Sequence, residues 1–129
     1  MERFSGSRII SKMITAYETK NLMIEDPRWW KIALMDFVDD FRRNKDIAAI
    51  EIPFELGDQE KDAVFAGVIE TLCDEMGMEI PTWLAIVPNP KRPVFLSRME
   101  NLKAIAIVES PVRFRLRNVF VCDNFLFRV

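Results

Sequence analysis

The chain has 129 residues, of which 50% are hydrophobic and 29% are charged, and its formal net charge is −2. This composition excludes a disordered chain and predicts one domain over residues 1–129 that folds without a metal or a disulfide. The sequence contains no histidine, so it lacks the commonest general base, the commonest zinc ligand and any histidine-activated nucleophile. We therefore expect no metal, no cofactor and no catalytic residues, and an enzyme is the minority hypothesis.

The sequence predicts a cytoplasmic protein without membrane contact. No apolar run approaches the roughly 20 residues that span a bilayer, and residues 1–11 lack the apolar core of a signal peptide. Cys73 and Cys122 are the only cysteines, and Cys73 lies among apolar residues in a helical pattern. Such a cysteine is typical of a buried, reduced thiol.

Charge is distributed unevenly along the chain. The net charge is +2 over residues 1–45, −9 over residues 46–79 and +5 over residues 80–129. This pattern predicts either attraction between the acidic middle and the basic end within one fold, or two surfaces of opposite charge. The isoelectric point of about 5.3 argues against direct binding to nucleic acid, since nucleic-acid-binding domains are usually basic.

Apolar periodicity predicts two helices in the first third of the chain. The first extends from about Ser7 to Asn21 after flexible residues 1–7, and its apolar face is formed by Ile9, Ile10, Met13, Ile14 and Tyr17. Asp26 and Pro27 are typical of a cap followed by proline at the first helical position, so a second helix is predicted from there to Arg43. Its inward face carries Trp30, Ala33, Leu34, Phe37, Val38 and Phe41. The carboxylates on its other side are predicted to be solvated rather than to bind a cation, and they are Asp36, Asp39 and Asp40.

A third helix is predicted from Gly57 and Asp58 to Gly77. The preceding segment, residues 47–54, suits a short helical turn or an extended linker. Apolar residues form two adjacent rows on the helix, which contain Val64, Phe65, Val68, Ile69, Leu72, Cys73 and Met76. The opposite face is predicted to be the acidic surface, and it carries Glu60, Asp62, Glu70, Asp74 and Glu75.

Four prolines between Pro81 and Pro93 exclude a continuous helix there and favour an extended path. Trp83 in this segment suits either a peptide-binding aromatic platform or a side chain that pins the crossover to the core, and we favour the second. A further helix is predicted from Phe95 to Glu109, although residues 104–108 alone also suit a buried strand. We thus expect an all-α, mainly α-helical fold of about five helices, with a short extended segment near the C-terminus.

Residues 110–121 alternate arginine with apolar side chains, after a serine and a proline that are typical of a helix start. Guanidinium groups form planar, multi-donor hydrogen bonds, so three of them at every second position imply a fixed acidic or polar counterpart. That counterpart is either the acidic third helix of the same chain, helix carbonyls, or a partner protein. Under the last hypothesis the partner-binding residues are Arg113, Phe114, Arg115, Arg117, Asn118 and Phe120, and a second candidate surface is formed by Glu70 and Asp74.

From residue 26 onward, the order of several short motifs resembles a family of small, largely uncharacterised bacterial proteins. The motifs are Asp26-Pro27-Arg28-Trp29, Thr71-Leu72-Cys73-Asp74-Glu75-Met76-Gly77, Ile80-Pro81-Thr82-Trp83, Lys91-Arg92-Pro93-Val94-Phe95, Glu100-Asn101-Leu102-Lys103-Ala104, Glu109-Ser110-Pro111 and Asn118-Val119-Phe120-Val121. Similar modules follow helix-turn-helix domains in longer regulators. Proteins of this kind resemble antitoxin-like companions of nucleotidyltransferase-like toxins, which implies a protein partner of that type and includes no catalytic signature. The first two predicted helices lack the tight spacing and glycine turn of a helix-turn-helix, which argues against direct reading of DNA.

These observations predict a non-enzymatic protein-binding module, in which arginines act as charge-assisted donors and Phe114 and Phe120 act as apolar anchors. The acidic third helix is the second candidate, since it would suit a basic nucleotide-binding cleft. One alternative is a small enzyme that uses carboxylates with a lysine or Tyr17, and its candidate carboxylates are Glu51, Glu55 and Asp58. The other is a nucleic-acid-binding transcriptional regulator with one exposed basic stripe. The sequence leaves a homo-oligomer open.

Overall fold

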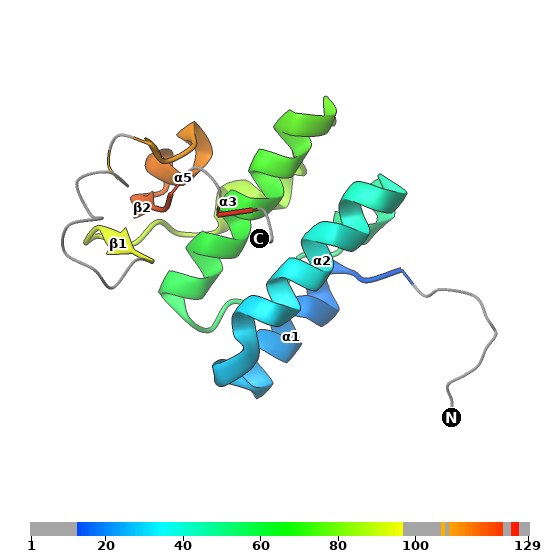
Figure 1. The fold of residues 1–129 in the computed structure, drawn as a ribbon, viewed down its shortest axis with the longest axis horizontal. Coiled ribbons are helices and arrows are strands. Elements are labelled where there is room, and N and C mark those ends of the chain that lie inside the picture. Colours follow the sequence, from blue (N-terminus) through cyan, green and yellow to red (C-terminus); the bar gives the residue numbers. More distant parts are fainter. Residues whose placement is uncertain (1–12, 97–106, 108, 123–124, 127–129) are drawn as a thin grey trace.

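The computed structural model of the chain describes residues 13–96, 107, 109–122 and 125–126. Helix, with 3-10 turns included, makes up 61% of this part of the chain, which also contains a sheet of two short strands. Figure 1 shows α3 between the pair α1 and α2 on one side and α5 with the two strands on the other. The mainly helical class is therefore confirmed. The described residues hold four α-helices, against about five predicted.

Helix α1 (Ala16–Glu25) begins later and ends later than its sequence pattern predicts. The hydroxyl of Thr15 accepts a hydrogen bond from the backbone N–H of Glu18 at 3.1 Å, so Thr15 caps the helix. Met13 and Ile14 consequently precede the helix instead of lying in it. Residues 1–12, which include the predicted flexible start and the predicted first turns, lie outside the described part of the chain.

The predicted second helix is confirmed as a 3-10 turn, η1 (Pro27–Trp29), that leads into α2 (Trp30–Asn44). Asp26 does not cap it with its side chain, contrary to the prediction; its backbone N–H instead donates to the carbonyl of Leu22 at the end of α1. Lys45 closes α2 in the left-handed conformation, with φ of 52°. The predicted solvation of Asp40 is wrong, because Asp40 is buried and accepts the backbone N–H of Ile14 at 2.9 Å.

The third predicted helix is confirmed as α3 (Gln59–Met76), which follows a 3-10 turn, η2 (Ile47–Ile50). The Asp58 carboxylate caps α3 by accepting the N–H groups of Glu60 and Lys61 at 3.1 and 3.2 Å. Gly77 ends the helix at φ of 68°, a left-handed conformation that glycine adopts without strain. Every residue from Asp62 to Ile69 is buried, so α3 is the central element of the fold.

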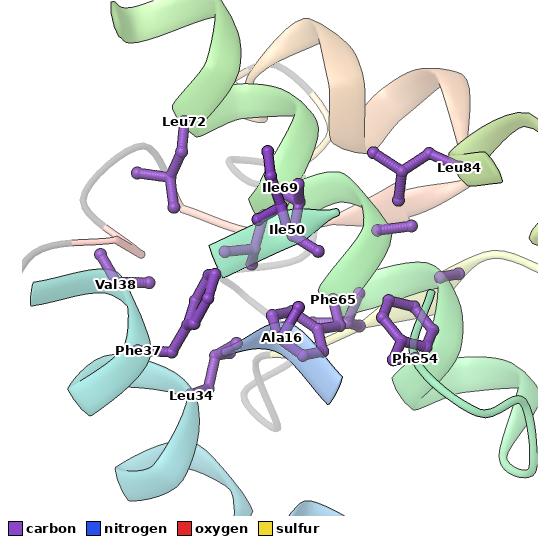
Figure 2. Close-up of a cluster of buried hydrophobic side chains, with 14 of the residues drawn as sticks. Ala16, Leu34, Phe37, Val38, Ile50, Phe54, Phe65, Ile69, Leu72 and Leu84 are labelled. Carbon is purple, nitrogen blue, oxygen red and sulfur yellow. The ribbon is translucent and has the colours of Figure 1, made fainter. Parts of the chain in front are cut away.

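Aromatic side chains from three segments meet where α2, α3 and residues 50–54 come together, as Figure 2 shows. Phe65 of α3 meets the ring of Phe37 edge-on at 5.2 Å and stacks on Phe54 at 5.1 Å. Phe37 also stacks on Phe41 at 5.7 Å. The rings of α2 therefore hold this helix against α3, as the apolar row of the second predicted helix indicates.

Trp83 pins the proline-rich crossover to the core, which confirms the favoured interpretation of this residue. It lies in the 3-10 turn η3 (Thr82–Ile86), and its indole N–H donates to the carbonyl of Ile50 at 2.9 Å. The ring makes a T-shaped contact with Phe54, at 5.2 Å between centroids. The crossover is consequently fixed to the segment that follows η2.

The C-terminal part differs most from the sequence-based expectation. Phe95 lies in β1 (Val94–Phe95) and not at the start of a helix, and β1 pairs in parallel with β2 (Val119–Phe120). Most of the predicted helix up to Glu109 lies outside the described residues. The arginine segment forms α5 (Val112–Leu116) before β2, so only its last residues are extended.

Asn118 explains how a helix and a strand follow each other so closely, because its φ of 65° reverses the chain between them. Cys73 is fully buried and carries a free thiol, as predicted. Among the described helices, none combines the length and the apolar composition that a membrane crossing requires.

Candidate functional site

Arg117 is a buried joint between three segments of the chain. Only 6% of the residue is exposed, and its guanidinium donates to both carboxylate oxygens of Glu70 on α3, at 2.7 and 3.0 Å. The same group donates to the carbonyls of Leu84 and Val87 at 2.7 and 3.0 Å and to the side-chain oxygen of Asn89 at 3.0 Å. The counterpart of Arg117 is therefore internal.

Arg113 makes a second ion pair one turn away on α5, and this pair is more exposed. Its guanidinium donates to both oxygens of Asp74 at 2.7 and 3.1 Å. The hydrogen bond to Asp74 raises the pKa of Arg113. Glu70 and Asp74, the second candidate surface, thus form one set of ion pairs with the arginines, which is the internal alternative that the sequence left open. The attraction between the acidic middle and the basic end operates within the fold.

Phe114 is part of the core, so its predicted role as an exposed anchor is wrong. It is completely buried against Gly67 of α3 and meets the ring of Phe125 edge-on at 5.8 Å. Two further predicted binding residues also have internal contacts. The amide of Asn118 donates to the carbonyl of Pro90 at 3.0 Å, and the half-buried ring of Phe120 stacks on Phe95 at 5.2 Å.

The outward face of α5 is formed by Val112, Arg115 and Leu116, which are spaced three and four residues apart and hence share one side of the helix. Val112 is 53% exposed and Leu116 is 66% exposed. Arg115 is exposed and makes no ion pair with any described residue. Leu116 also borders, with Ala85 of η3, a hollow of about 170 Å³ beside the buried arginine joint.

A wider apolar surface adjoins this face through η3. Ile86, the most exposed large apolar residue of the described chain, is 76% exposed and follows Ala85 directly. Phe54 and Val87 form the base of an apolar hollow of about 140 Å³, which Pro53, Leu56, Trp83 and Ile86 complete. We refer to this cavity as the apolar hollow.

Trp83 also lines a second cavity, which has a different chemical character. This cavity has a volume of about 470 Å³, and it is lined by Ile47, Glu51, Glu79, Ile80, Pro81, Thr82 and Trp83. Its two charged residues are carboxylates, and both are exposed. We refer to it as the carboxylate hollow.

The structure does not gather the candidate residues of the enzyme hypothesis into one cavity. Glu51 lines the carboxylate hollow, which contains neither a lysine nor Tyr17. Asp58 caps α3; burial opposes its ionisation, but hydrogen bonds and the charge of Lys61 lower its pKa overall. Glu55 is exposed and offers its backbone carbonyl to Lys20. Within the described residues, no group of carboxylates and cysteines is arranged to hold a metal ion.

A buried ion pair between Lys20 and Asp62 escapes sequence analysis. Lys20 is completely buried; it pairs with Asp62 and donates to the carbonyl of Glu55 at 2.7 Å. Asp62 also accepts the backbone N–H of Gly57 at 3.1 Å, so its predicted place on the acidic surface is wrong. The ammonium lies 4.9 Å from the centre of the Phe54 ring. The pair holds α1 against the start of α3. The only local indication that Asp62 is buried is the run of buried residues that follows it.

The chain matches no protein-family model, no curated protein and no solved structure. A functional assignment therefore rests on the surfaces described above. Of these, the outward face of α5 and the carboxylate hollow combine exposed apolar groups with charged side chains, and the apolar hollow shares Trp83 with the carboxylate hollow.

Proposed function

We propose that the protein is a non-enzymatic, cytoplasmic protein-binding module that contacts its partner through the outward face of α5. One observation carries this proposal: α5 exposes Val112 and Leu116 on the same side of the helix as Arg115, which makes no ion pair with the described chain. Covering exposed apolar side chains with a partner makes the free energy of binding more favourable. Arginine is enriched among the residues that dominate binding energy.

The ion pairs beneath α5 support the proposal because they hold the helix in place. Arg113 and Arg117 join α5 to Asp74 and Glu70 of α3 through bidentate contacts. A rigid face loses less conformational freedom on binding than a mobile one, so more of the contact energy appears as affinity. The alternating arginines thus divide into two that support the surface and one, Arg115, that belongs to it.

The proposed partner is a toxin-like nucleotidyltransferase that this module masks, as the resemblance to antitoxin-like companions implies. The chemistry of α5 requires the partner to present an acidic group for Arg115 beside an apolar depression for Leu116. Glu70 and Asp74 are already paired with arginines, so the acidic helix is the weaker candidate for this contact.

The test begins with the protein that co-purifies with this chain from its native host, identified by mass spectrometry and then produced in pure form. Leu116→Glu is expected to weaken its binding on the order of tenfold or more while Tm stays the same, because Leu116 is exposed in the free protein. Arg115→Glu is expected to weaken binding in the same way, and more strongly at low salt.

Ile32→Glu is the matched control, since Ile32 is 50% exposed on α2 and lies on another element. It is expected to leave binding unchanged. Wild-type affinity in Leu116→Glu and Arg115→Glu would exclude α5 as the contact. Loss of affinity in all three variants, with Tm unchanged, would indicate a general effect of charge.

A further inference from the structure

Trp83 offers a fixed aromatic surface between two hollows of different chemistry. Its indole N–H is engaged by the carbonyl of Ile50, and its ring makes a T-shaped contact with Phe54, so the ring orientation is set from within the protein. The carboxylate hollow and the apolar hollow are both lined by this ring. A ligand would therefore meet a ready-made surface, which needs no rearrangement of Trp83.

The carboxylate hollow has the composition of a cation site. Glu51 and Glu79 are exposed, form no ion pair with the described chain, and share the cavity with no lysine or arginine. The remaining lining is largely apolar and includes Ile47, Ile80 and the aromatic ring. Two carboxylates supply charge, an indole attracts a cation to its face, and the isoleucines suit a hydrocarbon stem.

We propose that the carboxylate hollow binds an arginine side chain of a partner protein. A planar guanidinium stacks on an indole and forms paired hydrogen bonds with carboxylates, whereas an ammonium acts as a strongly hydrated point charge. The volume of about 470 Å³ accommodates the guanidinium together with its three-carbon stem. Charge complementarity therefore defines the occupant: the hollow carries two negative charges and no positive one.

The apolar hollow indicates that the cation belongs to a polypeptide. It is lined by apolar residues only, and it shares Trp83 with the carboxylate hollow. A chain segment with an arginine and a nearby apolar residue fills both sites at once, which a free cation cannot do. The inference rests on the proposed function only in taking a protein as the ligand, and it uses residues other than those of α5.

The test is a titration followed by NMR of the three tryptophan indole N–H groups, with the Trp83 signal identified by its loss in Trp83→Phe. The probes are acetyl-Arg-Leu-Leu-amide, the same peptide with citrulline, which keeps the shape of arginine and removes its charge, the same peptide with lysine, and free arginine. We expect saturable shifts of the Trp83 signal with the arginine peptide at millimolar concentration. The citrulline peptide is expected to bind at least about tenfold more weakly.

Glu51→Gln/Glu79→Gln is expected to reduce the affinity for the arginine peptide by at least about tenfold. Glu25→Gln/Glu60→Gln makes the same change in net charge at exposed residues that line neither hollow, and it is expected to bind like the wild type. Trp83 is structural, so its substitution serves only to assign the signal.

Four results would overturn the proposal: no shift at Trp83, equal binding of the citrulline peptide, equal binding of a lysine peptide, or wild-type affinity in the Glu51/Glu79 variant. Free arginine that binds as tightly as the peptide would replace the protein ligand with a small cation. Leu116→Glu is expected to leave peptide binding unchanged. Failure at the hollow and failure of the α5 surface are consequently separate results.

Discussion

Gly67 of α3 and Phe114 of α5 pack so closely that a Cβ atom on Gly67 would lie 2.8 Å from the Phe114 ring. Real Cβ atoms essentially never lie so close to another atom, so the Phe114 ring or one of the two helices would have to shift. The absence of a side chain at Gly67 is therefore what allows α5 to lie against the centre of α3, and the contact explains why Phe114 points inward.

Gly67→Ala is expected to lower the free energy of unfolding by roughly 1 kcal/mol. Alanine gains up to about 1 kcal/mol in helix propensity, but overpacking of a buried site costs about 1 to 3 kcal/mol. Urea unfolding measures the difference. Phe114→Leu provides the control background, because the smaller side chain leaves room for the new methyl group. A Gly67→Ala effect of the same size in that background would show that Phe114 is not the obstacle.

Arg117→Ala is expected to destabilise the fold by about 3 to 5 kcal/mol, because it leaves the carboxylate of Glu70 and two carbonyls unpaired in a buried place. Arg115→Ala is expected to change stability by less than about 0.5 kcal/mol, since Arg115 is exposed. Thermal melts of both variants provide the comparison. Similar losses at both positions would contradict the division of the arginines into an inner and an outer set.

Lys20→Met is expected to destabilise the protein by about 3 to 5 kcal/mol, because it leaves the carboxylate of Asp62 buried without its ion-pair partner. Adding Asp62→Leu is expected to restore part of the loss, since the two apolar side chains replace both charges. A double-mutant cycle in urea measures the coupling. Strictly additive losses would indicate that the two side chains do not depend on each other.

Trp30→Ala is expected to destabilise the protein by about 2 kcal/mol, which is below the range for fully buried aromatic residues because Trp30 is only partly buried. Trp29 is 54% exposed, so Trp29→Ala is expected to cost less than about 1 kcal/mol. Equal losses would mean that α2 is covered on its outer side as well, as in a dimer. Sedimentation of the wild type distinguishes that case.

Burial raises the pKa of the Cys73 thiol from 9.0 to about 11. The folded state therefore disfavours the thiolate, while the unfolded chain releases the proton at its ordinary pKa. This contribution to stability is fully present below pH 9 and is lost as the pH rises from about 9 to 11. Unfolding curves of the wild type and Cys73→Ala across this window are expected to converge toward high pH. A constant difference would show that Cys73 does not titrate there.

The helices that packing and capping specify locally are the ones that sequence reasoning predicts well. Helix α3 begins after Asp58 and ends at Gly77, as expected, because a side-chain cap and a left-handed glycine act within a few residues of the helix end. The predicted start of α1 is wrong because the apolar periodicity includes Met13 and Ile14, whereas the helix begins after its cap, Thr15. Periodicity alone does not distinguish a helix from a segment that merely packs beside one.

The contacts of the candidate site join residues far apart in the sequence, and local patterns do not predict them. Glu70 and Arg117 are separated by 47 positions, so a sequence pattern shows that the guanidinium needs a counterpart without showing which one it has. The alternation around Arg115 suits a strand, but Pro111 favours a helix start and Asn118 turns the chain after one short helix. The two hollows depend on the contact of residues 47–56 with η3 and its Trp83, and no local motif predicts that contact.

The ion pairs under α5 would couple the affinity for the proposed partner to the order of the C-terminal segment. The outward face keeps the geometry described above only while Arg117 stays bonded to Glu70, Leu84 and Val87. By mass action, a partner that binds this face favours the conformation in which Arg117 keeps these bonds. It thereby reduces the population of states in which the bonds are broken. Amide hydrogens of β2 and of its neighbour β1, which are not part of the proposed contact, should therefore exchange more slowly in the complex.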